Sequence, residues 1–514
     1  MEEIKKDNII EFLKKSKISI IIIIVFALFA FGQRLISGGF SIDTELYIDQ
    51  LGMGVNESWW IGLSRWGLVF LNNFLQMGSL PIFAENYLTL IFMIMYSITY
   101  NYLFYTLIDE KYKKTFLKFQ FIFPIIFITN PVFAEHYNFI IQNAGVALAI
   151  LMIPIAMLLV HKAMEEQNKI KKVLYYVVAI GMSIIGFGVY QSITLLYIAT
   201  VVVCYLLKVI KDKDNNWVYL LKQIGIFAII AVIYFLISKI LGQNTTYLQS
   251  AWTKDGIGQC LINIKNCMKS VINCDTIFYN IGYIASLLTG IGMIVYLAVK
   301  KKLKIGIVIA IVGLLMAPFY IMIVTGVDQL KRTQFNYSFV IGIMMTLLII
   351  FLAQKEKLKY LTIIGLIFVF GIAYVQSFTT SSLFHTADVV YKSDEAFAHK
   401  LVERIEEKEW YNADEQYTLI FVGEHLTELG DTYLKSEIIG RSFFEFDYQY
   451  IYGVNQRAQA FLRILGYEFK NPTVEEFENA KQYVEENNIS IYPEENAIQL
   501  VNNDKIIVRL SEEY

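Results

Sequence analysis

The first long apolar run of the chain reads Ile18-Ser-Ile-Ile-Ile-Ile-Ile-Val-Phe-Ala-Leu-Phe-Ala-Phe31, and several lysines precede it. Continued to residue 35, the run approaches the roughly 20 residues that cross a bilayer as a helix. Gly38-Gly-Phe-Ser41, which follows it, is a poor match for a cleavage site with small residues. We therefore predict an uncleaved first membrane span rather than a signal peptide.

Comparable runs recur along the chain. Of its 514 residues 56% are hydrophobic and only 18% are charged, with a mean hydropathy of +0.48, which excludes an ordinary soluble domain. We predict an α-helical polytopic membrane protein with about eleven transmembrane helices. The expected spans are roughly 18–35, 84–108, 119–130, 138–160, 173–188, 190–207, 217–240, 277–299, 305–325, 336–353 and 360–377.

The basic residues are distributed unevenly between alternate loops. Lysines cluster within 5–17, 111–118, 162–172, 208–213, 300–304 and 355–359, all on one side of the expected spans. The opposite loops before residue 378 hold only Arg65, Lys254, Lys265, Lys269, Lys331 and Arg332. Because lysine and arginine gather in cytoplasmic loops, the N-terminus is predicted to be cytoplasmic. An odd number of spans then places the C-terminal segment outside the cell.

The composition changes at about residue 378, where the chain becomes charged. Residues 1–377 are predicted to form the membrane domain, and residues 378–514 a small extracytoplasmic α/β domain. Within it we expect a helix over 394–410, a buried strand over 418–423, a helix over 458–465 and a strand hairpin over 497–510. In the first outer segment the aromatic residues at about 46–83 predict helices lying in the membrane interface.

An acidic pair, Asp43 and Glu45, follows the first span in Ser41-Ile-Asp-Thr-Glu-Leu46. Carboxylates beside a membrane are costly unless they are solvated or used, and one of them can act as a general base. One of the two is expected to act and the other to bind the acceptor or orient the first. Which one is the base stays open. Glu135 is a third outer-face acid, and all three together would suit a hard metal ion, although nothing in the sequence requires one.

Basic residues at the outer ends of spans face these acids. Arg65, Lys331 and Arg332 suit the phosphate of a lipid carrier, or simply anchor the protein near lipid headgroups. His136 is expected to hydrogen-bond the same phosphate or to cap a turn. Tyr190 and Gln191 lie in another outer turn at membrane depth.

Several common sites are missing. The phosphate-binding pattern G-x-x-x-x-G-K-[ST] and the zinc pattern H-E-x-x-H do not occur. Cys260, Cys267 and Cys274 recur every seven residues in one outer loop, where a disulfide between two of them is possible, but no histidine lies near to complete a metal site. No cofactor and no nucleic-acid partner are expected.

These segments together resemble the bacterial Gtr-type II glucosyltransferases, polytopic enzymes of the GT-C superfamily. The resemblance covers nearly the whole chain, although each motif is short. The matching segments are Ser41-Ile-Asp-Thr-Glu45, Ser64-Arg-Trp-Gly67, Asn130-Pro131 with Glu135, Tyr190-Gln-Ser192, Arg332, Phe421-Val-Gly423 and Phe444-Glu-Phe-Asp447.

The resemblance implies an enzyme of the bacterial plasma (inner) membrane that takes a sugar, most often glucose, from a polyprenyl-phosphate donor and transfers it to a surface glycan. Asp43 would be the base and the transfer would invert the anomeric carbon, with Glu45 as its catalytic neighbour. Arg65, Lys331, Arg332 and His136 would bind the donor phosphate, and Glu135, Tyr190, Gln191 and Trp66 the substrates. No metal is expected. Here the acidic pair is Asp-x-Glu, so Glu45 is also a candidate for the base.

Other functions compete with glycosyl transfer. A transporter or flippase for a lipid-linked glycan also needs many spans, but transporters often contain paired repeats, and none is visible here. A GT-C enzyme for another sugar or a ligase, and a non-catalytic assembly factor, are further alternatives. The sequence does not distinguish the donor sugar or the acceptor.

Overall fold

The computed structural model describes residues 8–51, 56–75, 82–212, 214–242, 251–445 and 452–512. Contacts divide the chain into two compact units. The first comprises Met1–Leu35, Glu57–Tyr137 and Gln142–Ser381, and the second Ile36–Asn56, Asn138–Ile141 and Ser382–Tyr514. The second unit therefore gathers three segments that are far apart in the sequence.

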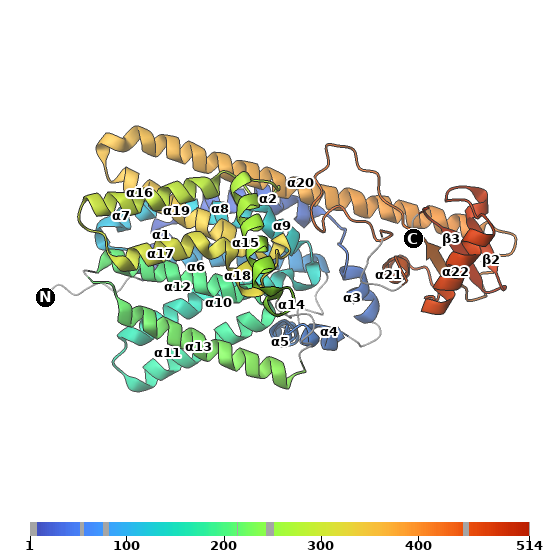
Figure 1. Ribbon diagram of the computed structural model, residues 1–514, viewed down its shortest axis with the longest axis horizontal. Coiled ribbons are helices and arrows are strands. Elements are labelled where there is room, and N and C mark those ends of the chain that lie inside the picture. The colour runs from blue at the N-terminus through green and yellow to red at the C-terminus, as the bar shows by residue number, and fades with distance from the viewer. Residues whose placement is uncertain are drawn as a thin grey trace. The chain divides into compact units, whose positions relative to one another are not determined.

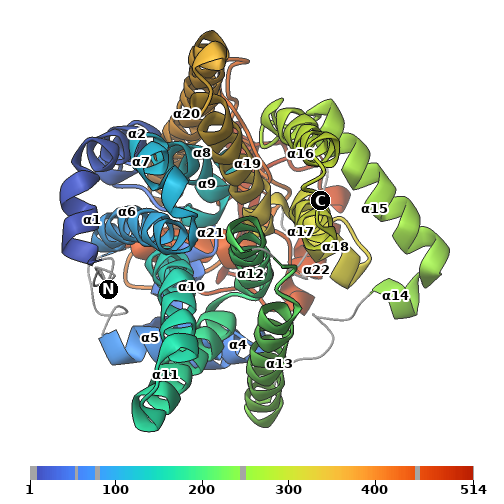
Figure 2. The same ribbon diagram turned by 90° about the vertical axis from the view of Figure 1, so that its left-hand side faces the viewer.

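The first unit is built from long apolar helices, which run in a common direction in Figure 1 and are seen nearly end-on in Figure 2. Ten helices within the described ranges are long and apolar enough to cross a membrane. The chain is thus a polytopic helical membrane protein, as predicted. These helices are α2 (Lys17–Ile36), α6 (Ile82–Leu107), α10 (Ile140–Glu165), α11 (Lys169–Val189), α12 (Ser192–Lys211), α13 (Trp217–Ile240), α16 (Gly282–Val299), α17 (Ile305–Met316) continued by η2 (Ala317–Phe319) and α18 (Tyr320–Thr325), α19 (Phe335–Ala353) and α20 (Lys359–Glu406).

Shorter helices connect these spans. In the first outer segment α4 (Asn56–Gly62) and α5 (Trp66–Leu75) fall within the range predicted for interfacial helices, of which residues 52–55 and 76–81 lie outside the described ranges. The remaining connecting helices are α1 (Ile9–Lys15), α14 (Ala251–Lys254), α15 (Gly256–Asn273), η3 (Lys331–Thr333) and η4 (Glu356–Leu358). All three loop cysteines are free thiols, and Cys260 and Cys267 are buried on one side of α15.

The continuous span predicted over 119–130 is wrong. This part of the chain forms three short helices, α7 (Glu110–Phe119), α8 (Ile122–Thr129) and α9 (Pro131–Tyr137). Eight residues of α-helix measure roughly 12 Å, far less than the hydrocarbon thickness of about 30 Å. Pro131 begins α9 because its fixed φ suits a first helical position, while its missing N–H cannot continue the preceding helix.

The three short helices nevertheless follow α19 along its length. The rings of Phe133 and Phe335 lie 5.3 Å apart at the start of α19. A Cβ atom added at Gly342, in the middle of α19, would lie 2.9 Å from the carbonyl oxygen of Phe123. Just after α19, Gln354 donates a hydrogen bond of 2.7 Å to Thr115 Oγ1. Since α19 is long enough to span, the segment from α7 to α9 accompanies it as an eleventh, broken traverse.

The second unit contains a three-stranded sheet in the order β1-β3-β2, drawn in orange and red in Figure 1. β1 (Thr418–Val422) pairs with β3 (Lys505–Arg509) in parallel, and β2 (Ile498–Val501) pairs with β3 antiparallel, which confirms the predicted strand and hairpin. Alternation along β1 directs Leu419 and Phe421 into one apolar cluster and Ile420 and Val422 into another.

Helices cover both faces of this sheet. The end of α20 and α21 (Asn455–Ile464) contribute to the first cluster through Leu401, Ile405 and Phe461, and α22 (Val474–Glu486) contributes Phe477 to the second. The helix predicted over 394–410 is the end of α20, and that over 458–465 is most of α21. The sheet is therefore buried on both faces despite its small size.

Candidate active site

The acidic pair lies where α3 (Thr44–Leu51) begins, in the second unit. The chain turns sharply there, since the Thr44 amide donates to the Ser41 carbonyl at 3.2 Å. Asp43 has φ +72°, the left-handed region that few non-glycine residues adopt, although aspartate tolerates it better than most. Strained backbone of this kind concentrates at functional sites. The turn gives the two carboxylates different surroundings.

One guanidinium contacts both members of the pair. Arg457, from α21, donates from Nη2 to Asp43 Oδ1 and from Nη1 to Glu45 Oε1, each at 2.7 Å. The side chain of Arg457 is 5% exposed, that of Glu45 0%, and that of Asp43 47%. The pair is therefore bound on one side by a buried cation, and only Asp43 keeps an accessible carboxylate.

Burial governs the charge of Glu45. It raises the pKa of Glu45 to about 7, and the negative charge of Asp43 acts in the same direction, while Arg457 opposes both. Its Oε2 atom has no hydrogen-bond partner in the described part of the chain. Removal from water thus outweighs the attraction of the guanidinium.

Apolar contacts hold the same segment in the second unit. Ile42 belongs to the apolar cluster on one face of the sheet, and Phe40 packs with its ring 5.6 Å from that of Phe443. At Gly39 an added Cβ would lie 2.7 Å from the ring of Tyr391, so only glycine fits there without a shift. The acidic segment is accordingly a packed part of the same unit as the C-terminal domain.

A second group of predicted site residues lies in the first unit and is called the basic cluster here. It consists of Arg65, His136, Tyr190 and Arg332. α4 ends at Gly62, and Ser64, at φ +59°, turns the chain toward α5. The Arg65 guanidinium donates to Gln142 Oε1 at 2.9 Å and its carbon lies 4.9 Å from the centre of the Tyr190 ring. Contact with an aromatic face is favourable for a cation.

His136 completes this cluster. Its ring lies 4.6 Å from that of Tyr190 and 5.2 Å from that of Phe335, and it is fully buried. Neither ring nitrogen has a hydrogen-bond partner among the described residues. The positive charges of Arg65 and Arg332 both act on this buried ring. A histidine with unpaired ring nitrogens, in range of two guanidinium groups, is suited to bind an anion.

The remaining charged residues predicted for the site differ in their surroundings. Glu135 is fully buried in α9, and α9 packs against η3, which carries Lys331 and Arg332. Lys331 forms an ion pair with Asp328, with Nζ 2.8 Å from Oδ2. Much of the charge of Lys331 is therefore balanced locally.

Trp66 and Gln191 contact the helices and the turn next to the basic cluster. The Trp66 indole donates to Ser238 Oγ at 3.1 Å and lies against Gly188, where an added Cβ would be 2.8 Å from the ring. Gln191 donates to the Leu63 carbonyl at 2.5 Å, next to the turn that carries Arg65. All these contacts are made within the protein. The substrate contacts predicted for Trp66 and Gln191 stay predictions.

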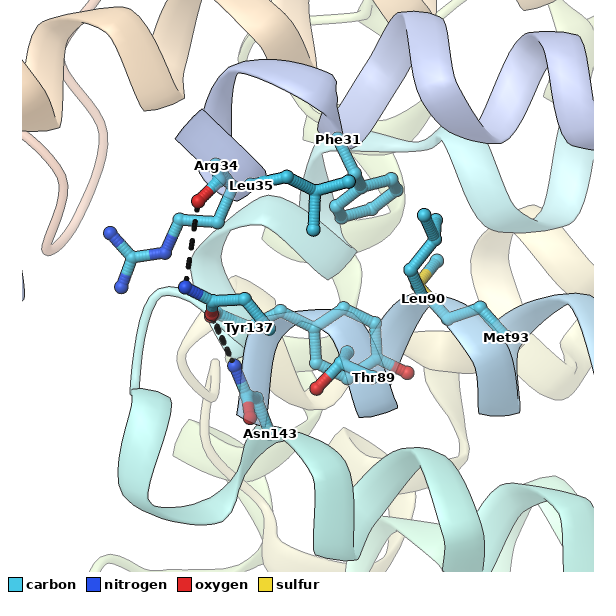
Figure 3. A pocket seen from close by; sticks show the side chains of 9 residues that line it. Phe31, Arg34, Leu35, Thr89, Leu90, Met93, Tyr137 and Asn143 are labelled. Atoms are coloured by element: carbon cyan, nitrogen blue, oxygen red, sulfur yellow. Dashed lines mark hydrogen bonds between the residues drawn. The ribbon is translucent and has the colours of Figure 1, made fainter. Parts of the chain in front are cut away.

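A small pocket lies elsewhere in the first unit, at the end of α2 (Figure 3). Asn143 donates to Asn86 Oδ1 at 3.0 Å, and Asn86 donates to the Arg34 carbonyl at 3.5 Å. The pocket has a volume of about 220 Å³, part of which is open to solvent. The residues that line it are Phe31, Arg34, Leu35, Asn86, Thr89, Leu90, Met93, Tyr137 and Asn143.

Within the described ranges no three side chains of the types His, Cys, Asp and Glu converge to hold a metal ion.

The predicted site residues fall into two groups. Asp43 and Glu45 form an acidic site in the second unit, whereas Arg65, His136, Tyr190 and Arg332 gather in the first.

Sequence reasoning missed Arg457 and Gln142. Arg457 is 414 positions from Asp43, in the C-terminal domain, and no local pattern links the two. The Phe444-Glu-Phe-Asp447 match gave no signal either, and its residues 446–447 lie outside the described ranges. The only signal for Arg457 in the sequence was an arginine beside the apolar residues of a helix.

A family model described as glucosyl transferase GtrII matches residues 34–353. The matched stretch contains all ten predicted site residues and ends before α20, the sheet and Arg457. The searches of curated proteins and of solved structures returned no match.

Proposed function

Because the chain belongs to the GtrII glucosyl transferase family, we propose that it moves glucose from a polyprenyl-phosphate carrier to a cell-surface polysaccharide on the outer face of the bacterial inner membrane. The observation that carries the proposal is the basic cluster around His136. Two guanidinium groups act on one buried histidine whose ring nitrogens have no hydrogen-bond partner in the described part of the chain. A phosphate is the substrate group that such donors recognise.

In the proposed reaction Asp43 accepts the proton of the acceptor hydroxyl, and the hydroxyl oxygen attacks the anomeric carbon of the sugar. The bond between that carbon and the phosphate oxygen breaks as the new one forms on the opposite face, so the configuration inverts. Lipid phosphate leaves with the bonding electrons. Arg65, Arg332 and the N–H of His136 stabilise the negative charge that develops on it, and Lys331 adds a weaker contribution.

Three further residues assist in this proposal. Tyr190 holds Arg65 and His136 together through its ring, and Gln191 fixes the turn that carries Arg65. Glu135 binds the acceptor. The chemistry needs no metal, since the leaving group is a monophosphate and the charge is balanced by side chains.

Turnover of the purified protein in detergent tests the proposal. Synthetic polyprenyl-phosphate sugars are supplied one at a time with surface glycan as the acceptor, and released lipid phosphate is measured. Release from the glucose donor is expected, with a loss of roughly 10²- to 10⁴-fold in Asp43→Asn. Asp49→Asn, which changes an acid within α3 itself, is the matched control and should stay near wild type. A chelator should have no effect.

Lack of turnover with every donor would contradict the proposal. If the protein then moved lipid-linked glycan across vesicle membranes, the alternative of a transporter or flippase would replace it. Release from a donor other than the glucose one would keep the enzyme class and change the sugar.

A further inference from the structure

We infer that Arg457 is a positioning residue that fixes the acidic pair, with Glu45 as its buried anchor and Asp43 as the carboxylate presented to the acceptor. This inference rests on the proposed function. It gives the C-terminal domain a part in the chemistry and assigns the role of base, which the sequence leaves open.

The geometry of the guanidinium supports the inference. Arg457 divides its donors between the two carboxylates, Nη2 to Asp43 and Nη1 to Glu45, both at 2.7 Å. A planar fork that binds two acceptors restricts both in direction as well as in distance. Neither carboxylate can rotate freely while both contacts are present.

Exposure then separates the two acids. A general base has to reach the proton that it removes. The Asp43 side chain is 47% exposed, so it meets this condition, whereas that of Glu45 is fully buried. Glu45 Oε1 accepts from Arg457 Nη1 whether or not the carboxyl is ionised, so Glu45 holds the guanidinium in place. Arg457 in turn directs Asp43 through Nη2.

A second ion pair joins the same two helices and provides an internal comparison. Arg463 of α21 donates to both carboxylate oxygens of Asp49 in α3, each at 2.7 Å. It binds α3 to α21 as Arg457 does, but its hydrogen bonds within the described part of the chain go to Asp49 and Asn471 and not to Asp43 or Glu45. Loss of this pair loosens the helices without releasing the acidic pair.

Steady-state kinetics of Arg457→Gln, Arg457→Lys and Arg463→Gln test the inference, with the polyprenyl-phosphate donor and the glycan acceptor varied separately. A misplacement of about 1 Å costs on the order of 10²-fold in rate, so kcat of Arg457→Gln should fall about 100-fold with both KM values within about threefold of wild type. Arg457→Lys should recover part of kcat, and Arg463→Gln should stay within about threefold.

The assignment of base and anchor has its own pair of variants. Asp43→Asn should lose roughly 10²- to 10⁴-fold in kcat, whereas Glu45→Gln, whose amide oxygen still accepts from Arg457, should lose no more than about tenfold. This comparison does not depend on whether Arg457→Gln folds. The reverse order of losses would overturn the assignment.

The outcomes separate the inference from the proposed function. Wild-type turnover with an unchanged kcat in Arg457→Gln, or with equal losses in Arg457→Gln and Arg463→Gln, overturns the inference alone. Absence of wild-type turnover with any polyprenyl-phosphate sugar overturns the proposed function and the inference with it.

Discussion

At the scale of single residues, Asp43 and Glu45 carry the same chemical group and differ through their surroundings. The left-handed turn at Asp43 starts α3, after which Glu45 points into the unit and Asp43 stays half exposed. Burial favours the neutral form of Glu45 and sets its pKa near 7. A residue with this pKa links the stability of the fold to pH.

The stability of the protein is predicted to fall as pH rises from about 4.5 to about 7. In this window the unfolded chain has already released the Glu45 proton while the folded chain still holds it, so folding is favoured most at the acidic end. Above pH 7 the buried charge, beside Asp43 and Arg457, costs about 3 kcal/mol relative to the neutral group.

Apparent melting temperatures in detergent at pH 5 and pH 8 measure this effect. The decrease between the two values should be smaller in Glu45→Gln, which cannot ionise and still accepts a hydrogen bond from Arg457. Equal decreases in the wild type and the variant would show that Glu45 does not ionise in this range.

At the scale of elements, the close approach of α5 and α11 holds the basic cluster together. Gly67 lies against the backbone of α11, where an added Cβ would contact the Ile185 carbonyl oxygen and lie 2.6 Å from the carbonyl carbon of Gly188. Trp66 in turn lies over Gly188. Two glycines, Gly67 on α5 and Gly188 on α11, thus allow the two helix backbones to contact each other next to Arg65.

Gly67→Ala is predicted to destabilise the protein by about 1–3 kcal/mol, the usual cost of overpacking, because backbone atoms cannot move aside as flexible side chains do. It should also lower turnover, since Arg65 directly precedes α5. Gly181→Ala, in α11 with no atom within 4 Å of the added Cβ, is the matched control and should be neutral or slightly stabilising. Similar melting temperatures for the two variants would contradict the predicted contact.

At the scale of the whole molecule, the number of traverses decides on which side of the membrane each end of the chain lies. Ten apolar helices alone would return the C-terminal segment to the side of the N-terminus. The broken segment from α7 to α9 accompanies α19 and makes the number odd. With the lysine-rich loops inside, the C-terminal domain is then expected outside the cell.

Cysteine labelling checks this orientation. In a background with the native cysteines replaced, Asp504→Cys should react with a membrane-impermeant maleimide in intact cells, and Lys357→Cys only after permeabilisation. Reaction of both residues from the same side would contradict the odd number of traverses. The opposite pattern would invert the orientation.

The sequence by itself determined the helical membrane class, nearly all the spans, and the strand and hairpin of the C-terminal domain. These features depend on the length and period of apolar runs, which are local properties of the chain. The breaks in the segment from α7 to α9 were not predicted, because Phe119 to Asn130 is apolar enough for a continuous span. Only packing against α19 shows where its helices begin and end.

Only the tertiary structure decided which charged groups meet. The acids, Arg65, His136 and Arg332 were identified from their residue types and their places at the ends of spans. The pairing of Asp43 and Glu45 with Arg457, 414 and 412 positions away, left no trace in either local segment. The attraction between charges depends on distance in space and on removal from water, and both are set when distant segments pack together.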